Sequence, residues 1–371
     1  MKQIYVAYTP YHLLLSCGLA CLSRSKDDRY LLVIPVYSDV NRFCRCLTEW
    51  GDSPFSKIIM LNGIYDVASK IRRVGVIRNN IKIIKNFFSD DVNEFCEVFI
   101  FNDGYPEAQI IARLNHDKGG FNTYVEDGSA AYNSFVSPDA PIYKKIIYRL
   151  VFGAWHRDVK IMGTYKYIDK AMVAQPEFVR PELSCKDVIK MPKNVFNNLK
   201  SMGFISILFK NYGLEQANFN PNCILIVSHS DILSEELSDT YRYLVKYLLH
   251  FSGGLYVKYH PREREDDFLG VKRHSPEVEL IPKALPLEAV FVALQDENMP
   301  DIIVGDLSTS LLTARYLLKV STVISIMKFS DLVDKNLENI FKITGVYLPE
   351  DIDDLKTILE TIEGERTVTN I

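Results

Sequence analysis

The chain has 371 residues, of which 47% are hydrophobic and 24% are charged. This balance excludes an intrinsically disordered chain and is sufficient for two domains that each bury a core. The formal net charge of −4 excludes a global attraction to nucleic acid or to anionic lipid, so an anionic ligand would have to be held by a local site.

Short runs rich in β-branched and aromatic residues alternate with helix-like segments through the first half of the chain. The candidate strands cover residues 2–8, 29–37, 56–62, 97–103 and 121–127. Helix-like segments lie between them at residues 11–22, 41–50 and 106–115. Strands that are separated by helices and bounded by Gly, Pro, Asn or Asp predict βαβ units with a parallel sheet. We therefore expect an N-terminal Rossmann-like domain at residues 1–185.

The pattern changes at residue 186. Residues 186–221 alternate between helix-like and polar stretches and end in a cluster of Asn and Pro, which predicts a linker. A second alternation follows, with candidate strands at residues 223–230, 253–261, 278–283, 301–308 and 321–327 and helices at residues 232–251, 285–294, 310–318 and 349–363. This alternation predicts a second Rossmann-like domain at residues 222–371, with a C-terminal helix. Two such α/β domains that face each other across an interdomain cleft make up the GT-B fold class.

Polar residues follow several of the predicted strands at their carboxyl ends. In open α/β sheets, ligands bind beyond these ends, so substrate contacts are expected there. The adjacent carboxylates Glu126 and Asp127 come directly after a buried strand, and a solvated turn is the alternative interpretation for them. The candidate substrate-binding residues at the strand ends are Tyr8, Thr9, Pro10, Asp103, Gly128, Ser129 and His229.

Two strand ends of the second domain carry groups that suit an anionic ligand. His260 ends one strand, and Pro261 favours an extended backbone there, which fixes the direction of the ring. The buried strand at residues 301–308 runs into three hydroxyl residues and then a helix, where hydroxyls and free backbone N–H groups can hold a phosphate. An ordinary helix cap is the alternative for this segment. The hydroxyl residues are Ser308, Thr309 and Ser310.

Three short motifs, taken together, resemble the signatures of the bacterial sialyltransferases, a group that includes capsular polysialyltransferases and lipooligosaccharide sialyltransferases. The signatures are an acidic pair followed by glycine, a His-Pro pair, and a serine followed by serine or threonine. In this chain they occur in the family's order at Glu126–Gly128, His260–Pro261 and Ser308–Thr309. The resemblance implies a GT-B enzyme that moves sialic acid from a CMP-sialic acid donor to a hydroxyl of a surface glycan, namely lipopolysaccharide, O-antigen or capsule.

The resemblance also implies that the N-terminal domain, residues 1–185, binds the acceptor and supplies the general base. Glu126 is expected to be the general base that removes the proton of the acceptor hydroxyl. Asp127 would orient the loop and raise the pKa of Glu126 by like-charge repulsion, and Gly128 would allow a tight turn. Displacement of CMP in one step predicts inversion at the anomeric carbon.

On the donor side, the resemblance implies that His260 is the general acid or the cation that stabilises the leaving phosphate. Ser308 and Thr309 would bind the same phosphate at the start of a helix. Lys258 matches a lysine of the family, and Glu288 matches a glutamate that holds the donor ribose. The expected donor-binding residues are Lys258, Pro261, Glu288, Ser308, Thr309 and Ser310.

No metal and no cofactor are expected. Seven cysteines without CxxC pairs or zinc spacing predict a reduced, cytoplasmic protein. No segment reaches the ~18 apolar residues that a membrane span requires, so any contact with the inner membrane would be peripheral, from the cytoplasmic face, to reach a lipid-linked acceptor. Four acidic pairs do not end buried strands and are interpreted as solvated turns or helix ends. These pairs are Asp27/Asp28, Asp90/Asp91, Asp266/Asp267 and Asp353/Asp354.

Three alternatives remain open. Transfer of another CMP-activated nonulosonic acid, or of Kdo, would use the same residues at the phosphate and a different sugar pocket. A GT-B-shaped epimerase or polyol-phosphate transferase would also place histidine and hydroxyls on a phosphate, but it should recognise UDP or CDP. A non-catalytic binding protein that retains the fold is the third. The sequence does not predict the acceptor, the linkage, the number of sugars added or the oligomeric state.

Overall fold

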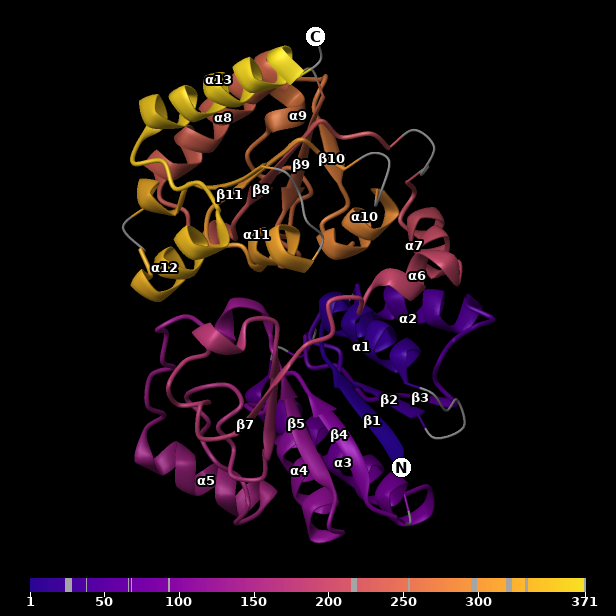
Figure 1. Cartoon of the computed structure of the whole chain (residues 1–371). Coiled ribbons are helices and arrows are strands. Elements are labelled where there is room, and N and C mark those ends of the chain that lie inside the picture. The colour runs from indigo at the N-terminus through magenta and orange to yellow at the C-terminus, as the bar shows by residue number, and fades with distance from the viewer. Residues whose placement is uncertain are drawn as a thin grey trace. The chain divides into compact units, whose positions relative to one another are not determined.

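The computed structural model describes residues 1–23, 29–37, 39–65, 67, 69–92, 94–214, 219–252, 254–294, 299–317, 322–330 and 333–369. The chain divides into two compact units, Met1–Gly213 and Leu214–Ile371 (Figure 1). Each unit has one sheet with helices between its strands, and the prediction of two Rossmann-like α/β domains is confirmed. Within the described ranges, no helix is both long enough and apolar enough to cross a membrane.

The first unit contains a seven-stranded parallel sheet with the order β3-β2-β1-β4-β5-β6-β7. Its strands are β1 (Lys2–Ala7), β2 (Arg29–Val33), β3 (Lys57–Met60), β4 (Cys96–Ile100), β5 (Phe121–Val125), β6 (Lys170–Val173) and β7 (Asp187–Lys190). Its helices are α1 (Pro10–Leu22), α2 (Val40–Glu49), α3 (Lys70–Asp90), α4 (Pro106–Asp117), α5 (Ile142–Phe152), α6 (Asn197–Ser201) and α7 (Phe204–Asn211). Consecutive residues of β1 and β4 are buried because both faces of the sheet are covered, as is usual for parallel sheets.

The predicted linker, residues 186–221, differs in the structure. Its first part forms β7 at the edge of the first sheet, followed by α6 and α7, which pack on α1 and α2. The indole ring of Trp50 stacks on Phe204 with ring centroids 4.4 Å apart, and its Nε1 donates a hydrogen bond of 2.8 Å to the carbonyl of Met202. The first unit therefore continues to Gly213, because apolar residues of this polar-looking segment are buried against it. Residues 215–218 lie outside the described residues.

The second unit contains a five-stranded parallel sheet with the order β10-β9-β8-β11-β12. Its strands are β8 (Cys223–Val227), β9 (Leu255–Tyr259), β10 (Glu279–Ile281), β11 (Ile302–Gly305) and β12 (Thr322–Ser325). Its helices are α8 (Glu235–Ser252), α9 (Val271–His274), α10 (Leu287–Leu294), α11 (Thr309–Leu312), α12 (Lys335–Thr344) and α13 (Ile352–Thr369). The C-terminal helix predicted from the sequence corresponds to α13.

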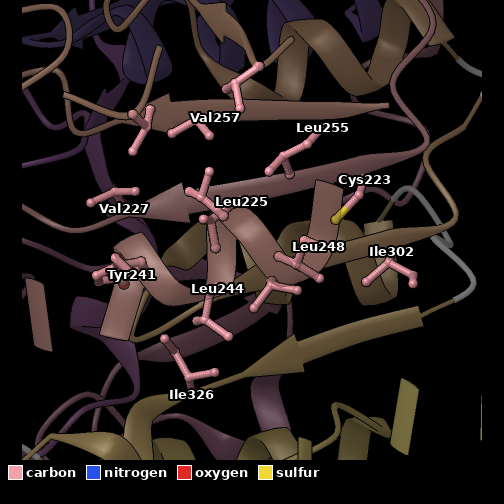
Figure 2. Close-up of a cluster of buried hydrophobic side chains, with 14 of the residues drawn as sticks. Cys223, Leu225, Val227, Tyr241, Leu244, Leu248, Leu255, Val257, Ile302 and Ile326 are labelled. Carbon is pink, nitrogen blue, oxygen red and sulfur yellow. The ribbon is translucent and has the colours of Figure 1, made fainter. Parts of the chain in front are cut away.

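The core of the second unit lies between its sheet and α8 (Figure 2). Tyr241, Leu244 and Leu248 repeat at helical spacing along α8 and are fully buried. They belong to one cluster with Leu225 of β8 and Val257 of β9. This packing fixes the strands whose carboxyl ends carry the candidate site residues of this unit.

Candidate active site

The acidic motif follows β5, next to strands β4 and β6. The backbone N–H of Glu126 donates a hydrogen bond of 3.0 Å to the carbonyl of Met172, which extends the pairing of β5 with β6 by one residue. Gly128 has a φ of 60°, a conformation that glycine adopts without strain, and it starts a 3-10 helix at Gly128–Ala131. The turn expected at this glycine is therefore present, and it redirects the chain directly after the two carboxylates.

Glu126 is almost fully buried, with 2% of its surface exposed. Its Oε2 accepts hydrogen bonds from the hydroxyl of Tyr132 and from the backbone N–H of Ala174, the latter 2.7 Å long. Burial raises the pKa of Glu126 to about 7, although these two hydrogen bonds oppose the increase. A carboxyl group that titrates near neutral pH is well suited to take up and release a proton.

Asp127 is the more accessible carboxylate of the pair, with 28% of its side chain exposed. Its Oδ1 lies 2.8 Å from Nε2 of His12, whose side chain is buried. His12 lies in the first turn of α1, where its backbone N–H donates a hydrogen bond to the hydroxyl of Thr9. Its ring stacks on Phe101 with ring centroids 4.5 Å apart. Among the described residues, its Nδ1 has no hydrogen-bond partner. The pairing joins the ends of β1 and β5, on either side of β4 in the sheet.

The other candidate residues of the first unit mainly support this edge of the sheet. Tyr8 is buried and stacks on Tyr105 at 4.8 Å, Thr9 caps α1, and Pro10 is the first residue of α1. Asp103 is fully buried and accepts hydrogen bonds from the N–H groups of residues 163 and 165, at 2.8 and 2.7 Å. Its pKa is raised to about 6 by burial. Both carboxylate oxygens of Asp103 are thus engaged by the backbone of the loop at residues 163–165.

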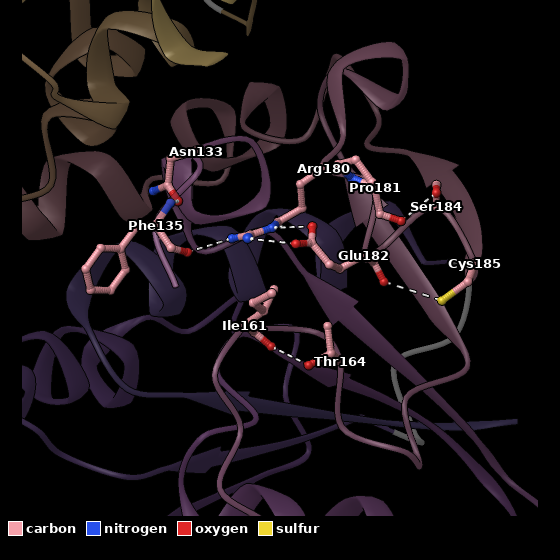
Figure 3. Close-up of polar contacts among 9 residues, drawn as sticks. All are labelled: Asn133, Phe135, Ile161, Thr164, Arg180, Pro181, Glu182, Ser184 and Cys185. Carbon is pink, nitrogen blue, oxygen red and sulfur yellow. Dashed lines mark hydrogen bonds and ion pairs between the residues drawn. The ribbon is translucent and has the colours of Figure 1, made fainter. Parts of the chain in front are cut away.

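Arg180 anchors the loop that follows the acidic motif (Figure 3). Its guanidinium donates to the carbonyl of Phe135 at 2.9 Å and to the carboxylate of Glu182 at 3.0 Å. Its backbone N–H donates to the carbonyl of Ala131 at 3.0 Å. Because Arg180 is itself buried, these contacts tie the loop to the connection between β6 and β7 and limit its movement.

In the second unit, His260 follows β9. Its Nδ1 accepts a hydrogen bond of 3.1 Å from the N–H of Arg262, so the neutral ring carries its proton on Nε2. Burial, with a smaller effect from the charges of Arg262, His229 and Lys258, lowers the pKa of His260 to about 3. At neutral pH the imidazole is uncharged in the protein alone and offers an N–H donor. The ring of His229 packs edge-on against it at 5.3 Å.

The hydroxyl segment after β11 is joined to α10. Ser308 caps α11, with its Oγ accepting from the N–H of Ser310 at 3.3 Å. The hydroxyl of Ser310 donates a hydrogen bond of 3.0 Å to Oε1 of Glu288, which is buried. Burial raises the pKa of Glu288, and the positive charge of Lys258 partly offsets this. The structure thus brings Glu288 to the hydroxyl segment, with Ser310 lying 22 positions later in the sequence, and the positive charge of Lys258 acts on Glu288.

Lys258 is buried on β9 and is held by backbone carbonyls. Its Nζ donates to the carbonyl of Tyr259 at 3.0 Å and to that of Lys283 at 2.6 Å. β9, β8 and β11 are neighbours in the sheet, so the segments that follow them lie at one edge. The donor-binding residues predicted at these strand ends, including Pro261 and Thr309, therefore gather at a single edge of the second unit.

A hollow of about 410 Å³ lies beside His229. Its lining combines both signs of charge and includes a buried carboxylate, Glu263, which accepts from the N–H and the hydroxyl of Ser230. His229 contacts both this hollow and the ring of His260, so the expected substrate contact of His229 is compatible with its position. The lining residues are His229, Ser230, Asp231, Arg262, Glu263, Arg264, Glu265 and Phe268.

No group of three or more potential metal ligands occurs among the residues that the structure describes. The acidic pairs have local structural roles where they are described. Asp267, for example, accepts from the hydroxyl of Tyr259 at 2.6 Å and from the N–H of Val271 at 2.8 Å. Asp27 and Asp28 lie outside the described residues. Metal independence therefore stays a prediction.

Comparison with protein families decides what kind of protein this is. The family model described as alpha-2,8-polysialyltransferase (POLYST) matches residues 3–327, a range that contains all three motifs. The chain belongs to the alpha-2,8-polysialyltransferase family. This polysialyltransferase-family protein is accordingly a sialyltransferase, and thus a glycosyltransferase that uses a nucleotide-sugar donor and a glycan acceptor. The resemblance identified from the three motifs is confirmed.

Solved structures support the fold of this polysialyltransferase-family protein. UDP-GlcNAc 2-epimerase from Methanocaldococcus jannaschii has a TM-score of 0.55 at 11% identity, covering 97% of this chain and 92% of that chain. UDP-GlcNAc 2-epimerase from Neisseria meningitidis, bound to UDP-GlcNAc, has a TM-score of 0.51 at 13% identity, covering 98% of this chain and 100% of that chain. The N-terminal domain of Candida albicans trehalose-6-phosphate phosphatase has a TM-score of 0.50 at 11% identity, covering 97% and 89%. These low identities support the GT-B fold class alone. No curated protein matched the sequence.

Proposed function

We propose that this protein is an inverting, metal-independent sialyltransferase that moves sialic acid from CMP-sialic acid to a hydroxyl of a surface glycan. The observation that carries the proposal is the family match, because its range includes the acidic, His-Pro and Ser-Thr motifs. The lipopolysaccharide, O-antigen or capsule of the cell would supply the acceptor. We place the reaction in the cytoplasm, at the inner membrane if the acceptor is lipid-linked.

Glu126 is the proposed general base. The acceptor hydroxyl oxygen attacks the anomeric carbon of the donor, the bond from that carbon to the phosphate oxygen breaks, and Glu126 takes the hydroxyl proton. A pKa of about 7 supports this role, because such a group is partly ionised at neutral pH and can still bind the proton firmly. Asp127 and Gly128 shape the loop and contact the acceptor, together with Ser129. Attack from the face opposite the leaving CMP inverts the anomeric centre.

His260 is the proposed partner of the leaving phosphate. The low pKa supports a neutral imidazole that donates a hydrogen bond from Nε2, rather than an imidazolium. The hydroxyls of Ser308 and Thr309 would donate to the same phosphate. Glu288 would position Ser310 and hold a ribose hydroxyl, and Lys258 would compensate its charge. These donors stabilise the negative charge that develops as CMP departs.

The acceptor is proposed to end in sialic acid. The description of the family names an α-2,8 linkage, in which one sialic acid is attached to another, and this favours a sialoside over a galactoside for this chain. Whether one residue or a polymer is added is decided by the length of the product.

A second candidate function is an epimerase or polyol-phosphate transferase that binds UDP or CDP. The UDP-GlcNAc 2-epimerases share the fold of this chain at 11% and 13% identity, so the nucleotide that the protein binds has to distinguish this candidate from a sialyltransferase. Transfer of another CMP-activated nonulosonic acid or of Kdo is a third candidate, because the leaving group would be the same.

Nucleotide and donor preference test the proposal. Thermal shifts should be larger with CMP than with UDP or CDP, because a ligand at about 100 times its Kd stabilises the folded protein by roughly 2.7 kcal/mol. Release of CMP should then be measured with CMP-sialic acid, CMP-legionaminic acid, CMP-pseudaminic acid and CMP-Kdo. Stabilisation by UDP alone, or CMP release only from a donor other than CMP-sialic acid, would contradict the proposal.

A further inference from the structure

Helix α5 turns its apolar side chains toward solvent, which is unusual for a helix of a folded domain. Its sequence is IYKKIIYRLVF. Five large apolar residues within these eleven positions are exposed. Their exposed fractions are 77% for Ile142, 67% for Tyr143, 54% for Ile146, 48% for Ile147 and 80% for Leu150. In Figure 1, α5 lies on the outside of the first unit.

The exposed residues occupy one continuous side of the helix. At 3.6 residues per turn, the arc from Ile142 to Ile147 spans about 140°. The opposite side is the one that packs on the domain: Phe152 is buried, and its ring contacts Tyr148 at 5.6 Å and His156 at 5.6 Å. The apolar side is therefore not the side that holds α5 to the first unit.

Cations flank this apolar side, and α5 contains no acidic residue. Lys144 and Arg149 lie near its two edges at helical spacing, and neither forms a salt bridge with a residue that the structure describes. Lys144 instead lies 5.5 Å from the ring of Tyr148. Lys145 differs, because it pairs with Asp139 at 2.6 Å and with Asp158 at 3.6 Å. Two cations thus remain available to a negatively charged surface.

Isolated apolar side chains at a protein surface are ordinary and need no explanation. The other exposed large apolar residues of this protein are distributed over several elements, as Ile71 is on α3 and Ile343 on α12. A continuous apolar side with cations at both edges differs from this background. It has the pattern of a helix that lies in the interface of a membrane, with the apolar side in the acyl region and the cations at the head groups.

We propose that α5 is a membrane-binding helix that docks the protein on a bilayer containing anionic lipid. The apolar side of α5 enters the interface, and Lys144 and Arg149 contact lipid phosphates. The net charge of −4 means that the chain as a whole is not attracted to such a surface, so the attraction has to come from this local set. The inference does not depend on which donor the enzyme uses, and it would place the glycosyltransferase beside lipid-linked acceptors.

Vesicle sedimentation with the full-length protein tests the apolar side. The probes are vesicles of phosphatidylcholine alone and of equimolar phosphatidylcholine and phosphatidylglycerol. Binding is expected to the second and to be much weaker with the first. The Ile146→Glu/Leu150→Glu variant should lose binding by on the order of 100-fold, because two apolar side chains are replaced by charges that the lipid disfavours. Its thermal stability should stay near wild type, since both positions are exposed.

A second variant tests the cations. Lys144→Gln/Arg149→Gln should weaken binding to the anionic vesicles by roughly 25-fold, because each basic residue near an anionic surface contributes about fivefold. The matched controls are Ile71→Glu/Ile343→Glu on α3 and α12 and Lys246→Gln/Lys335→Gln on α8 and α12, which make the same changes of polarity and charge elsewhere. Both controls should bind like wild type.

Three results would overturn the inference. The first is that the wild-type protein does not bind anionic vesicles. The second is that the α5 variants bind as tightly as wild type or that the controls lose binding equally. The third is a self-association in solution that the Ile146→Glu/Leu150→Glu variant abolishes while vesicle binding is unchanged, which would assign the apolar side to a second copy of the chain.

Discussion

His12 Nε2 lies 2.8 Å from Asp127 Oδ1 and joins the start of α1 to the loop after β5, although the two residues are 115 positions apart in the sequence. The contact leaves the buried histidine inside the domain and the carboxylate partly exposed. Asp127 is thereby held in one orientation beside Glu126. We propose that this pair positions Asp127 on the acceptor side of the proposed reaction.

Replacing His12 should impair use of the acceptor. His12→Gln is expected to lower kcat/KM for the acceptor by about 10- to 100-fold, because Asp127 loses the group that orients it, while KM for the donor stays unchanged. Steady-state kinetics with each substrate varied in turn would measure this. His116→Gln, an exposed histidine on α4, is the control. A loss of thermal stability with unchanged acceptor kinetics would reduce His12 to a structural role.

Replacing Glu126 should separate activity from stability. Glu126→Gln is expected to lower kcat by about 10² to 10⁴, because the proposed base is lost. The folded pKa of Glu126 is raised from 4.5 to about 7, so the folded state binds the proton more tightly and wild-type stability falls as pH rises from 4.5 to about 7. The variant lacks this loss, so its free energy of unfolding should exceed that of wild type by about 3 kcal/mol at pH 8 and be nearly equal to it near pH 4.

Urea unfolding of both proteins at the two pH values measures the stability difference. Glu97→Gln, a partly buried position near the start of β4, is the control and should change neither quantity. Full activity in Glu126→Gln would show that Glu126 is not the general base. A variant that is less stable than wild type at pH 8 would contradict the claim that burial raises the pKa of Glu126.

His260 should act as a neutral hydrogen-bond donor. Its pKa of about 3 predicts that the pH profile of kcat/KM has no limb from this residue between pH 5 and 8, and that only the rise near pH 7 from Glu126 is seen. His260→Gln keeps an N–H donor near the position of Nε2 and should retain more activity than His260→Ala, which should lose about 10² to 10⁴. His229→Gln is the comparison variant. If His260→Gln and His260→Ala lose equal activity, and kcat/KM of wild type falls as pH rises through about 6.5, then His260 acts instead as a charged imidazolium.

Glu288 and Ser310 should behave as a coupled pair. Their hydrogen bond of 3.0 Å predicts that Glu288→Gln and Ser310→Ala each raise KM for the donor, and that the double variant costs less than the sum of the two single effects. A double-mutant cycle on donor KM measures the coupling. Strictly additive effects would show that the two residues act on the donor independently.

Chelation should leave the activity largely intact. The proposed phosphate contacts come from His260 and from hydroxyl groups, so no divalent cation is required for them. Activity would be assayed after dialysis against EDTA, with and without added Mg²⁺. Loss in EDTA that Mg²⁺ restores would refute metal independence.

The local pattern of the sequence predicts most of the fold. Apolar runs that end in polar residues identify β1, β4 and β5 as well as β8, β9 and β11, because each strand is buried on both faces and its carboxyl end is not. Segments that mix apolar and polar residues do not reveal where they pack. Phe204 and Leu208 lie among Lys and Asn and look like parts of a linker, and only their contacts with α2 show that they belong to the first unit.

The site is predictable to the same degree. Motifs of two or three residues predict Glu126, His260 and Ser308 as site residues, because each follows the carboxyl end of a strand. The pairing of His12 with Asp127 depends on the strand order β1-β4-β5, which the spacing along the chain does not encode. The burial of Glu126, which raises its pKa, and the hydrogen bonds from Tyr132 and Ala174, which oppose that increase, likewise have no signal in the acidic motif itself.

The most direct test of the central claim is a transfer assay with CMP-sialic acid and an array of sialosides and galactosides, analysed by mass spectrometry and by NMR of the new linkage. Wild type should attach sialic acid with inverted anomeric configuration and release one CMP for each residue transferred, and Glu126→Gln and His260→Ala should each be severely impaired. If no acceptor gains sialic acid, or if both variants are as active as wild type, the account is contradicted.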